Sequence, residues 1–390
     1  MPSAWPSNTA SCKKRSSTAE HRRGLFVLVV LLATMVHSGC AMKRRQSESP
    51  VNDPAKEPAA KAPLNGQPAH CGSASAGKGH DQPGDRASFV ARRREGSRVV
   101  LAGGQVGWLR TDAVVRFDPA GSAEPQRNEL GRPRGLAVAP AGLVALGQPA
   151  LTEVVRVGAS VERAQGYVGL TDDGIVRLWA EADGVWIVGK TDIQWLPAIP
   201  VGKLLEVGRK LALDVHGTPH AEVEVSRLSD GAFVHARGSE ITRIAIDDTR
   251  QQLAVPTDVG LAVAIEGAGP RAWLSLLGGG LALVDLPPVR LVACVELGAH
   301  DHVHSFAADT GAVAAVVAEQ ATAGADPAWS VRVHDNAGKP LLRVALPWQP
   351  TAADTPDISV AIADGRVAVA SAERLVVWDI ATQKLLVDRN

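Results

Sequence analysis

Short apolar runs separated by turn signals fill residues 96–390, and this pattern constrains the fold more than any other feature. Each run has the length of a strand, and most are rich in β-branched residues and bounded by Gly, Asp or Pro. The runs are residues 97–104, 112–118, 174–181, 184–189, 221–228, 242–247, 260–266, 281–286, 311–319, 329–335, 341–347, 358–364, 366–370 and 374–380. No stretch longer than about ten residues shows the helical period. The pattern predicts an all-β domain of short antiparallel strands.

A longer repeat is superimposed on these runs. In each copy an apolar strand leads to an Asp and then to a short turn. The matching stretches are VVRFDPAGSA (114–123), VRVHDNAGKPLL (331–342), VVWDIATQKLL (376–386) and, more loosely, LALVDLPPVRLV (281–292). Asp285, Asp335 and Asp379 lie 50 and 44 residues apart, close to the period of about 40–45 residues in a WD40 blade.

Two further stretches carry a family resemblance. The segment from Gly298-Ala299-His300 through Trp329 to His334-Asp335 is similar to a degenerate Gly-His…Trp-Asp unit, and Trp378-Asp379 is a clean terminal dipeptide. Residues 96–390 therefore resemble a WD40- or quinoprotein-like β-propeller. About 295 residues at about 42 per blade predict seven blades, with six or eight as alternatives.

The recurrent Asp at the strand end has two interpretations. Its carboxylate can accept backbone N–H groups of the turn that follows, which is a structural role. Catalysis is the alternative, but general acid or base chemistry needs a positioned partner that the sequence does not reveal. We favour the structural role for Asp118, Asp285, Asp335 and Asp379, and we expect Trp195 and Trp378 to pack between neighbouring blades.

His300, His302 and His304 form the densest candidate for metal binding. On a strand, alternate residues face one side, so the three imidazoles would project together and offer ligands for zinc or copper. The alternative is that His300 belongs to the turn before the strand and lies off it. The sequence does not decide between them, and we assign no catalytic, cofactor-binding or metal-binding residue and no cofactor.

The N-terminal region has the plan of an export signal. Basic residues 13–23 precede the apolar run 25–36, and Ser38-Gly39-Cys40 follow. The run is shorter than the about 20 apolar residues of a bilayer span and matches a signal-peptide core. Residues 13–40 resemble a bacterial lipoprotein signal with Cys40 as the lipidated residue. Plain secretion, with cleavage after Ala41, and a short uncleaved anchor are the alternatives.

Three regions follow from these observations: a signal peptide at residues 1–39, a disordered tether at residues 40–95 and the propeller at residues 96–390. The tether is dominated by Pro, Ala, Ser, Gly and charged residues, which cannot bury enough apolar surface to order the chain. Cys71 within it is predicted to be an exposed loop cysteine, with a metal site beside His70 and His80 as the alternative.

Charge and cysteine content exclude some classes of protein. The chain has 41 Lys and Arg against 41 Asp and Glu, so no net field favours nucleic acid. Its four cysteines, scattered along the chain, are too few for a disulfide framework. They are Cys12, Cys40, Cys71 and Cys294.

These features predict a lipoprotein of the bacterial cell envelope whose propeller faces the periplasm or the exterior. We expect the lipid anchor to contact the membrane and the propeller to serve as a scaffold that binds a protein partner. The alternative is a propeller enzyme, such as a hydrolase, lyase or cofactor-dependent dehydrogenase, with its site at the central channel. The sequence favours the non-enzymatic function because it contains no recognisable catalytic motif.

Overall fold

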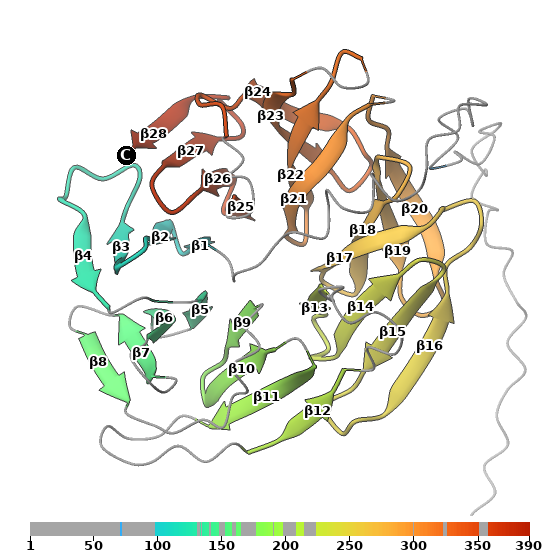
Figure 1. The fold of residues 1–390 in the computed structure, drawn as a ribbon, viewed down its shortest axis with the longest axis horizontal. Coiled ribbons are helices and arrows are strands. Elements are labelled where there is room, and N and C mark those ends of the chain that lie inside the picture. Colours follow the sequence, from blue (N-terminus) through green and yellow to red (C-terminus); the bar gives the residue numbers. More distant parts are fainter. Residues whose placement is uncertain are drawn as a thin grey trace, which may run out of the picture. The chain divides into compact units, whose positions relative to one another are not determined.

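The fold is described from a computed structural model (Figure 1). The structure describes residues 71, 98–130, 133, 135–139, 142–147, 153–157, 161–164, 177–189, 191–197, 208–213, 224–298, 300–322, 326–350 and 358–390. The chain divides into two units, residues 1–62 and 63–390, and every described residue belongs to the second. The predicted signal peptide, Cys40 and all of the predicted tether except Cys71 lie outside the described residues.

Each strand in this set belongs to a four-stranded antiparallel sheet made of four consecutive strands. The first three sheets contain β1 (Val99–Ala102), β2 (Gln105–Leu109), β3 (Ala113–Phe117) and β4 (Gln126–Glu129); β5 (Gly135–Ala139), β6 (Gly142–Gly147), β7 (Glu153–Val157) and β8 (Val161–Ala164); and β9 (Arg177–Ala180), β10 (Gly184–Val188), β11 (Asp192–Pro197) and β12 (Lys210–Ala212).

The next two sheets contain β13 (Val225–Arg227), β14 (Phe233–Arg237), β15 (Glu240–Ile244) and β16 (Arg250–Ala254); and β17 (Ala262–Ala268), β18 (Arg271–Leu276), β19 (Leu281–Asp285) and β20 (Arg290–Val295). The last two contain β21 (His302–Ala308), β22 (Ala312–Glu319), β23 (Ala328–Asp335) and β24 (Pro340–Ala345); and β25 (Ser359–Ala363), β26 (Arg366–Ala370), β27 (Leu375–Asp379) and β28 (Leu385–Arg389). The described part of the chain thus forms seven such sheets.

The sheets are arranged around a common centre in chain order (Figure 1). Strand β5 contacts β9 of the next sheet, β14 contacts β17, and β21 contacts β25. The last sheet returns to the first, where β25 and β26 pack against β1. The arrangement is an all-β propeller, which confirms the predicted fold class.

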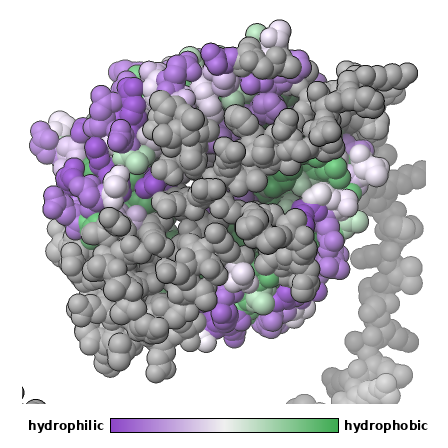
Figure 2. Space-filling model, in the orientation of Figure 1, coloured by the Kyte–Doolittle hydropathy of each residue, from purple (hydrophilic) through white to green (hydrophobic). Residues whose placement is uncertain are grey.

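Apolar side chains fill the spaces between neighbouring sheets. Trp378 lies in a cluster with Trp329 and Val360, which joins the last two sheets. Trp195 packs on the cluster that joins β9–β12 to β13–β16, with its ring 4.9 Å from that of Trp186. Both tryptophans therefore occupy the positions between blades that the sequence predicts. Hydrophilic residues cover much of the visible rim (Figure 2).

The predicted repeat corresponds to one position in the sheet. The strands that lead to Asp118, Asp285, Asp335 and Asp379 are β3, β19, β23 and β27, and each is the third strand of its sheet. The third strand is paired on both sides, and neighbouring sheets pack against its two faces. Its residues are therefore buried on both faces and read as a continuous apolar run. This burial explains why the repeat is most visible at this strand.

The prediction that Cys71 is an exposed loop cysteine is wrong. Instead of being exposed in a loop, Cys71 is buried and forms a disulfide with Cys294 on β20, 223 residues further on. The prediction fails because the partner is distant in sequence and comes close only when β17–β20 folds. Among the described residues, no helix has the length and apolar character that crossing a membrane requires.

Candidate functional site

The recurrent aspartates act mainly in turns. The Asp118 carboxylate accepts the N–H of Ala120 at 2.9 Å, and the Asp335 carboxylate accepts the N–H groups of Ala337 and Lys339 at 2.9 and 2.8 Å. The structural role predicted for these carboxylates is therefore confirmed.

Asp379 also accepts hydrogen bonds within the turn that follows it, whereas Asp285 binds arginine side chains. Asp379 accepts both the N–H and the hydroxyl of Thr382, and these hydrogen bonds hold the pKa of its carboxyl below the ordinary value. Asp285 instead binds two guanidinium groups, that of Arg290 at 2.6 Å and that of Arg271 at 2.8 Å. The hydrogen bonds from Arg290 are the largest cause of the lowered pKa of Asp285. Asp285 therefore links neighbouring strands rather than closing a turn.

The three histidines are not aligned on one strand. His300 lies in a turn before β21, as the alternative interpretation predicts, whereas His302 and His304 lie on β21. A bulge between Val303 and Ser305 breaks the alternation at His304, which is buried with its ring edge-on to Trp329 at 5.4 Å. Within the described ranges, no three metal-binding side chains form a group that could hold an ion.

Asp301 belongs to a charged network in the sheet β21–β24. It accepts the N–H of Gly298 at 3.0 Å and a guanidinium N–H of Arg332 at 2.7 Å. Arg332 also pairs with Glu319 at 2.7 Å, and Glu319 accepts from Ser330 and from Arg343. These contacts tie the turn before β21 to three strands of the sheet.

Burial alone would raise the pKa of Glu319, but the hydrogen bonds from Ser330, Arg332 and Arg343 outweigh that effect and leave the pKa below its ordinary value. The carboxylate is thus held ionised between two guanidinium groups. A group held in this way stabilises the sheet.

A second polar cluster joins the first strands of three consecutive sheets. Arg177 on β9 donates to both carboxylate oxygens of Glu266 on β17, at 2.5 and 2.8 Å. Ser226 on β13 donates to the same carboxylate at 3.1 Å and accepts the N–H of Gly267 at 2.8 Å. The Arg177 guanidinium also lies 4.9 Å from the ring of Trp179.

The cluster is shielded from water. The side chain of Glu266 is 4% exposed and that of Arg177 is 23% exposed. Burial lowers the pKa of Arg177, but the charge of Glu266 and the hydrogen bonds to it reverse the effect and raise the pKa. The hydrogen-bonding groups of Arg177 and Glu266 are directed at each other, so the pair fits a structural role in which it holds the sheets together.

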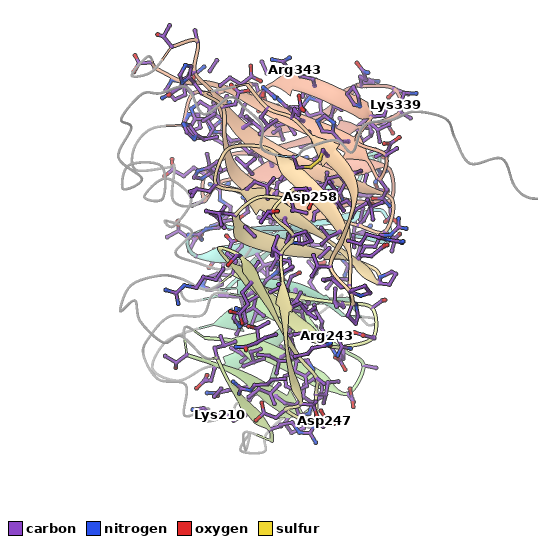
Figure 3. All side chains as sticks on the ribbon, turned by 90° about the vertical axis from the view of Figure 1, so that its right-hand side faces the viewer. Lys210, Arg243, Asp247, Asp258, Lys339 and Arg343 are labelled. Atoms are coloured by element: carbon purple, nitrogen blue, oxygen red, sulfur yellow. A yellow bond between two sulfur atoms is a disulfide. The ribbon has the colours of Figure 1, made fainter. Side chains whose placement is uncertain are left out.

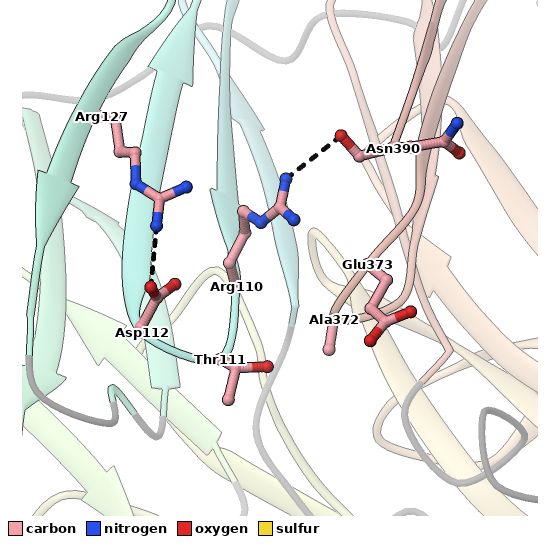
Figure 4. Close-up of a pocket in the computed structure, with 7 residues that line it drawn as sticks. All are labelled: Arg110, Thr111, Asp112, Arg127, Ala372, Glu373 and Asn390. Atoms are coloured by element: carbon pink, nitrogen blue, oxygen red, sulfur yellow. Dashed lines mark hydrogen bonds and ion pairs between the residues drawn. The ribbon is translucent and has the colours of Figure 1, made fainter.

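An open pocket of about 450 Å³ lies where the first sheet meets the last (Figure 4). The turn between β2 and β3, the turn between β26 and β27, and the residue after β28 form its wall. Its lining residues are Arg110, Thr111, Asp112, Arg127, Ala372, Glu373 and Asn390.

Charged groups from both sheets face this pocket. Arg110 donates to the Asn390 carbonyl at 3.2 Å and lies 4.6 Å from the ring of Trp108. Arg127 pairs with Asp112 at 2.8 Å, and Glu373 comes from the opposite wall (Figure 4). The pocket therefore offers guanidinium and carboxylate groups at a solvent-exposed seam, where a partner with complementary charges can bind.

Comparisons with known proteins give a structural likeness at low sequence identity. No protein-family model matches the sequence, and no curated protein matches it. Among solved structures, a variant of KlHsv2 with loop 6CD replaced by a Gly-Ser linker is 8% identical, with a TM-score of 0.50 over 73% of this chain and 92% of that chain.

Two further structures give TM-scores of 0.47. The WD40 β-propeller domain of Doa1 is 14% identical, with coverage of 73% of this chain and 92% of that chain. Virginiamycin B lyase from Staphylococcus aureus is 12% identical, with coverage of 72% and 92%. At such identities structural likeness shows the fold alone. The chain has a β-propeller fold.

Proposed function

We propose that the seven sheets are the blades of one protein-binding propeller, which a lipid on Cys40 holds at a bacterial membrane facing the periplasm or the exterior. The pocket between the first and last sheets carries the binding part of this proposal. Its charged groups come from two blades, so a peptide segment of a partner can pair with Arg110 and Glu373 together.

Two observations support the location and the anchor. Residues 13–40 have the basic, apolar and small-small-Cys order of a lipoprotein signal. The Cys71–Cys294 disulfide is of the kind that persists in oxidising compartments and is rare in the cytosol. The second observation is independent of the first, because it concerns the folded propeller.

Site-specific photocrosslinking tests the binding role. A photoreactive amino acid replaces Thr111 in the pocket or, as a control, the exposed Gln252 on β16. We expect a discrete protein adduct from position 111, reduced several-fold by Arg110→Ala or Glu373→Ala, and direct binding of the identified partner after purification. Equal adducts from both positions, or adducts indifferent to Glu373→Ala, would contradict the proposal.

The anchor has a separate test. The full chain and its Cys40→Ala variant are expressed in a host that processes lipoproteins, and membrane partition and intact mass are compared. We expect an acyl mass and membrane association for the wild type alone. A wild-type chain that is cleaved but soluble would show that the anchor assignment is wrong.

The enzyme hypothesis is the second candidate, because Arg177, Ser226 and Glu266 converge from three consecutive sheets. Such convergence is what a channel-based active site requires, although here the groups bind one another. A panel of hydrolase, lyase and dehydrogenase substrates, tested with the wild type and with Glu266→Gln, separates the two functions. Turnover lost in Glu266→Gln while the fold is retained would favour the enzyme.

A further inference from the structure

We propose that the outer edge of the ring around the Cys71–Cys294 disulfide is the surface that faces the lipid bilayer. This inference rests on the proposed lipid anchor at Cys40 and adds an orientation to it. Three observations carry it: where the disulfide fixes the chain, how much chain separates it from Cys40, and which side chains surround it.

The disulfide fixes Cys71 to the sheet β17–β20. Cys71 is buried in an apolar cluster that contains Val259 and Leu276. Its carbonyl lies close to Gly260, where a Cβ would come within 3.4 Å of the carbonyl oxygen. Cys294 lies on β20, the edge strand of its sheet, and Figure 3 shows the disulfide near the labelled Asp258. The propeller is therefore tied to the N-terminal part of the chain at this sheet.

The distance along the chain to the anchor is short. Thirty residues separate Cys40 from Cys71, whereas 58 separate Cys40 from Val99, the first residue of β1. Thirty residues reach at most about 100 Å when fully extended, and a flexible chain of that length averages about 30 Å end to end. The disulfide thus roughly halves the length of chain between Cys40 and its attachment to the propeller, which favours the β20 edge as the side that faces the membrane.

The side chains at this edge suit a bilayer surface. Four large apolar side chains are exposed among the described residues: Ile246, Leu261, Val292 and Leu385. Leu261 (49% exposed) follows Gly260, and Val292 (38% exposed) lies on β20 two residues before Cys294. Two of the four therefore flank the disulfide, where they can enter the headgroup region.

Basic side chains accompany these apolar groups. Arg290, at the start of β20, is highly exposed while it pairs with Asp285. Lys339 is exposed in the turn between β23 and β24, next to Gly338, which packs against the carbonyl of Cys294. Lysine and arginine near a membrane surface are attracted to anionic lipid headgroups. Apolar and basic groups thus lie together around the point where the tether is fixed.

Lipid crosslinking on the anchored protein tests this orientation. The lipidated full chain is reconstituted in vesicles of phosphatidylethanolamine and phosphatidylglycerol that contain a lipid with a photoreactive headgroup, and crosslinked peptides are mapped by mass spectrometry. We expect crosslinks at residues 258–262 and 290–296 to exceed those on β28 several-fold. In Cys71→Ser/Cys294→Ser, which keeps Cys40, we expect this preference to disappear.

A matched pair of surface variants provides the control. Leu261→Glu/Val292→Glu should reduce crosslinking at the β20 edge. Leu385→Glu, at a comparably exposed residue (42%) on β28, two sheets further along the ring, should not. These variants change exposed side chains, so their folding is not at risk.

The outcomes separate this inference from the proposed anchor. A wild-type chain that binds the vesicles but is crosslinked evenly on all sides would overturn the orientation alone. A wild-type chain that carries no lipid and does not bind would overturn the anchor, and the orientation with it. Equal preference for the β20 edge with and without the disulfide would show that the disulfide does not set the orientation.

Discussion

Arg177 and Glu266 form a two-point ion pair between β9 and β17, and the hydroxyl of Ser226 on the intervening sheet donates to the same carboxylate. Sheets of a propeller normally touch only their immediate neighbours, through apolar faces. Here one carboxylate holds groups from three consecutive sheets, so the pair restrains the relative positions of β9–β12 and β17–β20 as well as those of adjacent sheets.

Glu266→Ala should lower the free energy of unfolding by about 3–5 kcal/mol, because it leaves the Arg177 guanidinium shielded and without its partner. Urea unfolding followed by tryptophan fluorescence measures the change. The double variant Arg177→Met/Glu266→Met should recover most of the loss, since no unpaired charge is left. A loss below about 1 kcal/mol in Glu266→Ala would mean that water reaches the pair, as at a surface salt bridge.

Gly267→Ala should destabilise the fold by about 1–3 kcal/mol through overpacking. A Cβ at this position would lie only 2.1 Å from the backbone carbonyl oxygen of Arg227, and backbone cannot move aside as a flexible side chain can. Gly278→Ala is the matched control, because nothing lies within 4 Å of its Cβ position. Thermal unfolding of both variants measures the difference, and equal melting temperatures would contradict the close approach of β17 to β13.

The Glu319 network should make stability depend on pH. The pKa of Glu319 is lower in the folded protein than its ordinary value of 4.5, so the unfolded chain binds its proton more tightly. The stabilisation is therefore complete above about pH 5 and is lost as the pH falls through the folded pKa.

Unfolding free energies of the wild type and Glu319→Gln, measured between about pH 7 and pH 3, test this dependence. The wild type should be more stable than Glu319→Gln at pH 7, and the difference between their unfolding free energies should become smaller as the pH falls. Arg343→Gln, which removes one exposed contact of Glu319, should fall between the two. Parallel curves for wild type and Glu319→Gln would show that the carboxylate does not contribute in its ionised form.

Removal of the disulfide should cost about 2–4 kcal/mol, because it frees a long loop in the unfolded chain. Melting temperatures with and without dithiothreitol measure the effect, and Cys71→Ser/Cys294→Ser should melt at the same temperature under both conditions. Peptide mapping without reduction should recover Cys71 and Cys294 in one species. Alkylation of both cysteines in the unreduced native protein would refute the pairing.

The sequence predicts the third strand of a sheet better than the others. Strand β27 is flanked on both sides and buried, so its residues form an uninterrupted apolar run that ends in Asp379. Strand β2 contains Gly107 and β14 contains His235 and Arg237. Such residues weaken a strand signal, and both segments become strands because neighbours on each side supply their hydrogen bonds.

The contacts of polar residues also differ in how well the sequence predicts them. The turn role of Asp335 is predictable because its hydrogen-bond partners lie within four residues. The Arg177–Glu266 pair is not predictable, because its residues meet only when three consecutive sheets pack together. The pocket that joins Arg110 to Glu373 is not predictable either, because only closure of the ring brings the first and last sheets together. The disulfide is not predictable either, because its cysteines lie 223 residues apart and meet only when β17–β20 folds.

Each sheet of the described residues consists of four consecutive strands, and the last sheet is made of β25–β28. A growing polypeptide can therefore complete one sheet after another in the order of synthesis. Cys71 is made early, yet its partner arrives only with β20, the final strand of its sheet. The disulfide therefore cannot form before β20 has been made, and the junction of β1 with β25 cannot form before the last sheet has been made.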